Sequence, residues 1–211
     1  MTEQDRSDRL TTPAKDLVDT IQDFHQRGWC DGTGGNFSLV AQRSPLTLLM
    51  APSGVDKGKV SEEMLIEVND QAQVVRGAGR ASAETLMHLK IVETCHSGAV
   101  LHTHSTNATL LSKQACERGS ITLEGWEMLK GLRGVTTHDT EVNLPIIPND
   151  QDLSRLSETA APLLKQAPHG LLVAGHGLYA WGDSLQEARR HVEILEFLLE
   201  LQWKQQLLGI R

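Results

Sequence analysis

The chain has 211 residues with 20 Lys and Arg against 27 Asp and Glu, a formal charge of −7 and a pI near 5.7. This acidic balance argues against binding of nucleic acid through a basic surface, and the length suits one domain, residues 1–211, with its own core. Cys30, Cys95 and Cys116 form no C-x-x-C pair, and the chain shows neither a signal-peptide pattern nor a membrane-length apolar run, so we expect reduced thiols and a cytoplasmic protein.

The first elements follow from apolar spacing and turn residues. An apolar face predicts a helix that ends near Gly28; its members are Leu10, Ala14, Leu17, Val18, Ile21 and Phe24. Two hairpins are predicted next, with strands at 36–40 and 46–50 and then at 65–68 and 73–75. Ser82 is expected to cap a helix that ends before Gly98.

The second half is predicted as a strand, three helices, two strands and a last helix. In chain order these are residues 100–103, 106–116, 124–132, 151–166, 170–174, 178–181 and 184–208. The last helix carries Ala188, Val192, Leu195, Leu199 and Trp203 at helical spacing. That apolar stripe is expected to be either core or a subunit interface.

Three histidines form the pattern with the clearest chemistry. His102 and His104 lie two residues apart on and just after a predicted strand, so their side chains point to the same face. A third imidazole, His176 between two glycines, would complete a site for a divalent metal such as zinc that leaves one position open for water or substrate. The alternative is a pair of histidines packed on a sheet face, which is disfavoured because burying an unpaired imidazole costs free energy.

Short loops rich in glycine and serine suggest contacts to phosphate. Residues 34–36, the segment 52–54 and the Ser82–Ala83 pair offer backbone N–H groups and hydroxyls with little steric bulk. None of these loops matches a P-loop or a dinucleotide fingerprint. Each loop alone could simply be a turn. The presence of three such loops beside the histidines favours the interpretation that they bind a ligand.

Two glutamates are candidates for acid-base chemistry. Glu84 is predicted in the first turn of a helix, where a carboxylate most often serves the helix dipole. Glu127 lies between Trp126 and Met128, and a partly apolar setting would help its carboxyl to hold a proton near neutral pH. Spacing alone does not decide between them.

These motifs, in this order, resemble the class II aldolase and adducin-head family. The segments that carry the resemblance are 35–38, 52–54, 82–84, 100–105 and 174–177, which span nearly the whole chain. Within the family, segment 124–131 is most similar to the sugar-phosphate dehydratases. The resemblance implies an α/β fold of three α/β/α layers around a central, mainly antiparallel sheet, a homotetramer, and active sites at subunit junctions.

The resemblance also implies a role for each matched residue. His102, His104 and His176 would bind one zinc ion per subunit, and Glu127 would be the acid/base of a dehydration. Glu84 would match the glutamate that acts as acid/base or fourth metal ligand in the aldolases, although some dehydratases carry a cysteine at that position. The residues that match the phosphate-binding positions are Gly35, Asn36, Ser53, Gly54 and Ser82.

Other members of the same family offer alternative functions. An aldolase or a pentulose-phosphate 4-epimerase would use the same histidines and loops, but these enzymes also use tyrosines, and this chain has only Tyr179. A non-catalytic module of the adducin-head type would keep the fold and lose the metal ligands. The three intact histidines favour an enzyme, with a small sugar phosphate as its substrate and no nucleic acid or membrane partner.

Overall fold

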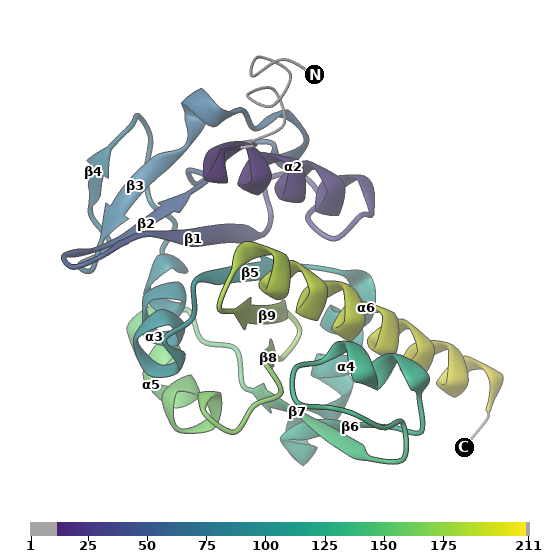
Figure 1. Ribbon diagram of the computed structural model, residues 1–211. Helices are drawn as coiled ribbons and strands as arrows, with labels where there is room; N and C mark the ends of the chain where they lie inside the picture. Colours follow the sequence, from purple (N-terminus) through teal and green to yellow (C-terminus); the bar gives the residue numbers. More distant parts are fainter. Residues whose placement is uncertain (1–11, 210–211) are drawn as a thin grey trace, which may run out of the picture.

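The computed structural model describes residues 12–209, and its centre is a nine-stranded sheet in the order β4-β3-β2-β1-β5-β9-β8-β7-β6 (Figure 1). The strands are β1 (Asn36–Arg43), β2 (Leu46–Met50), β3 (Ile66–Asn69), β4 (Val74–Arg76), β5 (Ala99–Thr103), β6 (Ser120–Glu124), β7 (Glu141–Ile147), β8 (Gly170–Val173) and β9 (Gly177–Gly182). Among the described strands only β7 and β8 pair in parallel, which confirms the mainly antiparallel sheet.

Helices cover both faces of the sheet and complete the three predicted layers. The helices are α2 (Pro13–Gln26), α3 (Thr85–Cys95), α4 (Thr106–Ala115), α5 (Leu153–Leu164) and α6 (Leu185–Leu208). One buried cluster joins α2, α4 and α6 to one face, and a second joins α3 and α5 to the other. Because side chains alternate along a strand, Leu101 of β5 enters the first cluster and Val100 the second. None of the described helices is long and apolar enough to cross a membrane.

Most predicted elements are confirmed, with three corrections. The first helix is present as α2, although Leu10 lies outside the described residues. The predicted helix 124–132 is wrong in its first part: residues 120–124 form β6, and only a 3₁₀ helix, η4 (Glu127–Gly131), follows. Strand β7 was not predicted, and its Pro145, a residue that weighs against a strand, lies within it.

The third correction concerns the start of α3. Ser82 does not cap this helix, because the helix begins at Thr85 and its N-cap is Glu84. Ser82 instead forms a turn: its Oγ accepts from the Glu84 N–H at 3.3 Å and its carbonyl from the Thr85 N–H at 3.0 Å. The Glu84 side chain makes no capping hydrogen bond to α3.

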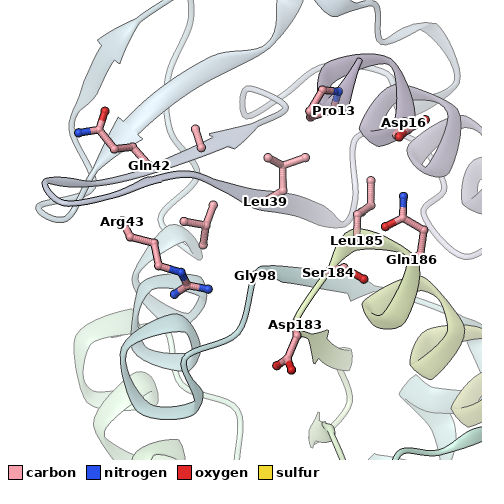
Figure 2. Close-up of a pocket in the computed structure, with 12 residues that line it drawn as sticks. Pro13, Asp16, Leu39, Gln42, Arg43, Gly98, Asp183, Ser184, Leu185 and Gln186 are labelled. Atoms are coloured by element: carbon pink, nitrogen blue, oxygen red, sulfur yellow. The ribbon is translucent and has the colours of Figure 1, made fainter. Parts of the chain in front are cut away.

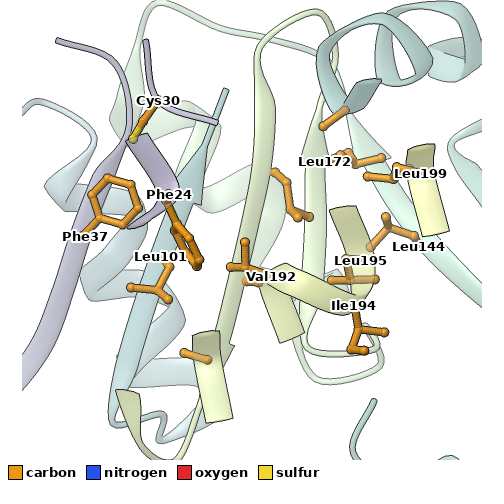
Figure 3. Packing of buried hydrophobic residues seen from close by; sticks show 14 of the residues in the cluster. Phe24, Cys30, Phe37, Leu101, Leu144, Leu172, Val192, Ile194, Leu195 and Leu199 are labelled. Atoms are coloured by element: carbon orange, nitrogen blue, oxygen red, sulfur yellow. The ribbon is translucent and has the colours of Figure 1, made fainter. Parts of the chain in front are cut away.

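The apolar stripe of α6 belongs to the core of the chain itself. Val192, Leu195 and Leu199 are completely buried against the sheet, where they meet Leu101 and Leu172 (Figure 3). Ala188 is also completely buried, and Trp203 is partly buried against the same cluster, so the stripe packs mainly on the sheet of its own chain.

Truncating this stripe should destabilise the fold. Leu195→Ala removes buried methyl groups between α6 and the sheet, and we expect it to lower the free energy of unfolding by about 2–5 kcal/mol. Urea denaturation followed by circular dichroism measures the loss. The exposed Leu207 on the same helix is the matched control, because Leu207→Ala should change the stability by less than about 0.5 kcal/mol. Equal losses in the two variants would contradict the packing described here.

Candidate functional site

Four side chains converge at the end of β5. His102 is in β5, His104 follows the strand, His176 lies in the turn between β8 and β9, and Glu84 is the N-cap of α3. Each offers one ligand atom, and these four atoms all lie within 4.8 Å of one another. The structure thus brings together the three histidines that the sequence singled out and adds Glu84 to them.

The contacts around His102 leave its Nε2 atom free to bind a metal ion. Its Nδ1 lies 2.9 Å from the carbonyl oxygen of Leu178, which can only accept, so Nδ1 carries the proton and Nε2 has a free lone pair. The Nε2 atom is 2.8 Å from Nε2 of His104 and 3.4 Å from Nε2 of His176. The ring of Tyr179 stacks on His102 at 3.8 Å and restricts its rotation.

The charge states of His104 and Glu84 favour the binding of a cation by the cluster. Burial, together with the neighbouring imidazoles, lowers the pKa of His104 to about 3, so the ring is neutral at physiological pH. Burial opposes ionisation of Glu84, but the neighbouring imidazoles of His102 and His176 hold the pKa of its carboxyl well below the usual range. Glu84 Oε1 lies 2.9 Å from His176 Nε2, and Oε2 accepts from the amide of Asn36. Three imidazoles and one carboxylate suit a divalent ion that prefers nitrogen and oxygen donors.

Strand pairing explains why these residues meet. Asn36 of β1 pairs with His102, and His102 pairs on its other side with Tyr179 of β9. The turn from β8 into β9 then returns His176 to the same end of the sheet. The Asn36 contact to Glu84 and the stacking of Tyr179 on His102 were not predicted from the sequence, because both join segments that lie far apart in the chain.

A close approach between β5 and β9 leaves no room for a side chain at Gly177. A Cβ atom there would lie 2.0 Å from the Thr103 carbonyl oxygen. We therefore expect Gly177→Ala to push the two strands apart beside His102, lower the stability by roughly 1–3 kcal/mol and reduce the metal content. Thermal melting and metal analysis of the purified variant measure both effects. Wild-type values in both measurements would mean that the strands tolerate the added methyl group.

The residues predicted to bind phosphate divide into two groups. Ser53 and Ser82 line one cavity of about 610 Å³ together with the exposed side chain of Arg80. Gly35 and Asn36 adjoin the metal-ligand cluster instead, since a Cβ at Gly35 would lie 2.9 Å from the His102 carbonyl oxygen. Gly54 follows Ser53 with a positive φ of 79°. Ala83, which lines this cavity, immediately precedes Glu84 in the chain.

The structure does not bring Glu127 into the cluster of its own chain. Its side chain is 67% exposed and pairs with Lys130 and with His138, whose Nδ1 is 3.5 Å away. The hydrogen bond from Lys130 lowers its pKa, so the predicted apolar setting that would favour a bound proton is wrong for the single chain. Met128 beside it is also exposed.

A second cavity is separate from this chemistry. It measures about 370 Å³ and lies between the start of α2, the end of β1 and the start of α6, with Leu39, Arg43 and Asp183 on its walls (Figure 2). Asn36, at the opposite end of β1, is the residue of that strand that contacts the metal-ligand cluster. The histidines other than the three ligand candidates also lie outside the cluster; they are His25, His88, His96, His138, His169 and His191.

Comparisons with known proteins identify relatives of this chain. The sequence profile of the class II aldolase and adducin N-terminal domain matches residues 15–203. A methylthioribulose-1-phosphate dehydratase of Xanthomonas campestris pv. campestris is 43% identical over 195 residues, which cover 90% of this chain and 88% of that protein. The enzyme of the same name from Serratia proteamaculans is 43% identical over 197 residues and covers 92% and 95%.

Solved structures give the same architecture. YgbL, a putative aldolase/epimerase/decarboxylase from Escherichia coli, superposes with a TM-score of 0.77 at 28% identity, over 91% of this chain and 88% of that one. An L-fuculose 1-phosphate aldolase superposes equally well, with a TM-score of 0.77 at 23% identity, over 93% and 87%. At that identity the second likeness concerns the fold alone.

Proposed function

This chain belongs to the class II aldolase and adducin N-terminal domain family, and we propose that it converts 5-methylthioribulose 1-phosphate to 5-methylthio-2,3-dioxopentyl 1-phosphate. The reaction is a loss of water, so the protein would be a hydro-lyase of methionine salvage, working in the cytoplasm as a single catalytic domain of residues 1–211. The observation that carries the proposal is 43% identity to dehydratases of this name over 90% of the chain, joined to an intact cluster of metal-ligand candidates.

The proposed metal ligands are His102, His104 and His176, with one zinc ion per subunit. The convergence of their nitrogens supports this assignment, and zinc suits three imidazoles with one position left open. Glu84 would be a fourth ligand when substrate is absent and would yield to it. A bound zinc ion would supply Lewis acidity at the C2 ketone and C3 hydroxyl of the substrate, which acidifies the C3 proton.

The phosphate of the substrate would bind in the cavity that Ser53 and Ser82 line. Their hydroxyls and the Gly35, Asn36 and Gly54 backbone would hold the C1 end of the sugar, so that C3 and C4 lie near the metal ligands. The Arg80 side chain on the same cavity would add a positive charge for the phosphate dianion. Fixing one end of a small substrate in this way can lower a barrier by several kcal/mol.

Glu127 is the proposed acid/base, and we propose that it serves a neighbouring subunit. Its exposed carboxylate lies on η4, outside the metal-ligand cluster of its own chain. We propose a homotetramer in which Glu127 of one subunit faces the metal of another. There it would remove the C3 proton or deliver a proton to the C4 hydroxyl that leaves. Loss of water at that interface would favour the protonated carboxyl, unlike in the single chain.

The competing reactions are aldol cleavage and epimerisation of a related sugar phosphate. Both are represented in the name of YgbL, which is 28% identical. The only tyrosine of this chain, Tyr179, is fully buried behind His102, and its burial raises the pKa of the phenol. A buried phenol of this kind is poorly suited to act on a substrate, which favours dehydration.

A substrate panel tests the proposed reaction directly. Purified, zinc-loaded protein is incubated with 5-methylthioribulose 1-phosphate and with other ketose 1-phosphates, and diketone formation is compared with aldehyde release. We expect diketone from the methylthio sugar and no aldehyde. Aldehyde release from any of these sugars, without diketone, would make the protein an aldolase.

The composite site predicts that activity depends on assembly. If Glu127 acts across a subunit boundary, dilution that dissociates the tetramer should abolish turnover while each chain stays folded. Light scattering, circular dichroism and rate measurements over the same concentration series compare the three properties. A monomer with full turnover would overturn the shared site.

A further inference from the structure

Glu196 is a carboxylate on the apolar face of α6. Only 2% of its surface is exposed, and its helix neighbours Val192, Leu195 and Leu199 are completely buried. Among residues 12–209, no lysine or arginine forms an ion pair with it. A carboxyl group in such a place loses its hydration, so its own hydrogen bonds must offset that cost.

Those hydrogen bonds go to the two residues that flank His104. Glu196 Oε1 accepts from Thr103 Oγ1 at 2.6 Å, and Oε2 accepts from Ser105 Oγ at 2.5 Å. Thr103 is the last residue of β5, and alternation along the strand turns its side chain toward α6 while His102 points to the other face. Ser105 is the N-cap of α4, where its Oγ also accepts from the Ala108 N–H at 3.0 Å.

The Glu196 carboxyl group therefore links Thr103, at the end of β5, to Ser105, at the start of α4. One residue lies between them in the chain. That residue, His104, leaves the strand, and its backbone N–H donates to the Trp29 carbonyl at 2.7 Å. Its direction depends on where Thr103 and Ser105 are held. Short hydrogen bonds from hydroxyls to a buried carboxyl are strong and directional, so they define both positions closely.

We propose that Glu196 is a positioning residue for the metal ligands, which holds Thr103 and Ser105 so that the imidazoles of His102 and His104 converge. This inference rests on the metal site proposed above and extends it to a residue that contacts neither metal nor substrate. Groups that orient metal ligands typically change metal affinity by 10–100-fold when they are replaced. Glu196 would act through the backbone on either side of a ligand.

Metal binding by Glu196→Gln tests the proposal. Glutamine keeps the size of the side chain, but it can accept with only one of its two terminal atoms, so one hydroxyl loses its acceptor. Metal-free protein is titrated with Zn²⁺ against a competing chelator, and with Co²⁺, whose visible absorption reports the ligand geometry. We expect a Zn²⁺ Kd raised about tenfold or more and an altered Co²⁺ spectrum, with an unchanged far-ultraviolet circular dichroism spectrum.

Val192→Ala is the matched control, because it removes buried volume one turn earlier on the same helix and leaves the hydrogen bonds of Glu196 to Thr103 and Ser105 in place. It should lower the melting temperature and leave the Kd and the Co²⁺ spectrum unchanged. If Glu196→Gln binds Zn²⁺ within twofold of the wild type, or if Val192→Ala loses as much affinity, Glu196 is only a core residue and the proposal is wrong.

Variants at Thr103 approach the same contact from the strand and keep the test decisive if Glu196→Gln fails to fold. Thr103→Val removes the hydroxyl at constant shape and should weaken Zn²⁺ binding severalfold, whereas Thr103→Ser restores the hydroxyl and should restore the affinity. Equal affinities for the two variants would overturn the proposal. A wild-type chain that binds no Zn²⁺ would instead overturn the proposed function, which separates the two failures.

Discussion

His102→Ala should remove metal and activity together. His102 lies between His104 and His176 in the cluster, with its Nε2 within 3.4 Å of the Nε2 atoms of both. Its loss leaves two imidazoles and one carboxylate, and we expect less than about a tenth of the wild-type zinc content and no measurable dehydration. Metal analysis of the purified protein and a diketone assay give the two values.

His138→Ala is the matched control for this experiment. His138 is an exposed imidazole outside the cluster, so its replacement should leave one zinc ion per chain. Only the zinc content is compared in this control, because His138 Nδ1 lies 3.5 Å from the Glu127 carboxylate. Circular dichroism separates metal loss from unfolding, since His102 is buried in β5. A His102→Ala protein with full zinc content and full turnover would refute the assignment of the metal ligands.

The second large effect is expected from Glu127→Gln. Glutamine matches the size of glutamate but exchanges no proton, so kcat should fall by about a hundredfold or more, with zinc content and substrate affinity preserved. Steady-state kinetics measure kcat and KM separately. Because the side chain is mostly exposed in the single chain, the substitution should have little effect on the stability of the monomer.

Glu124→Gln is the control for Glu127→Gln, because Glu124 is an exposed carboxylate three residues earlier in the same segment. It should keep kcat within a few-fold of the wild type. If Glu127→Gln also retains near wild-type turnover, the acid/base role moves to Glu84, which already lies 2.9 Å from His176 Nε2. Glu84→Gln would then show the larger loss of kcat.

Glu84 would serve as a metal ligand in the proposed mechanism. Its low pKa keeps the carboxylate charged, which suits a ligand of a divalent cation better than a group that must hold a proton. Glu127 lies free of the cluster and is available to transfer protons. The geometry of the single chain therefore supports a division of labour in which Glu84 completes the metal site and Glu127 carries the acid-base step.

The sequence by itself determined the features that depend on local order. Three such features are properties of a few neighbouring residues. They are the spacing of His102 and His104 at the end of a strand, the apolar face of the first helix and the turn residues that bound the hairpins. Alternation along a strand therefore predicted that two imidazoles share one face, and the cluster agrees. The resemblance of the motifs to the family added the prediction of three α/β/α layers.

Tertiary structure alone decided which distant residues meet. The register of β1, β5 and β9 places Asn36 and Tyr179 beside His102, and a turn at Ser82 brings Glu84 to the cluster. The packing of α6 against the sheet buries its apolar stripe and brings Glu196 into hydrogen-bond contact with Thr103, the residue before His104. Each of these contacts joins segments far apart in the chain. Local periodicity predicts which face of a helix or strand is apolar. Which of these faces pack against one another depends on contacts throughout the folded core.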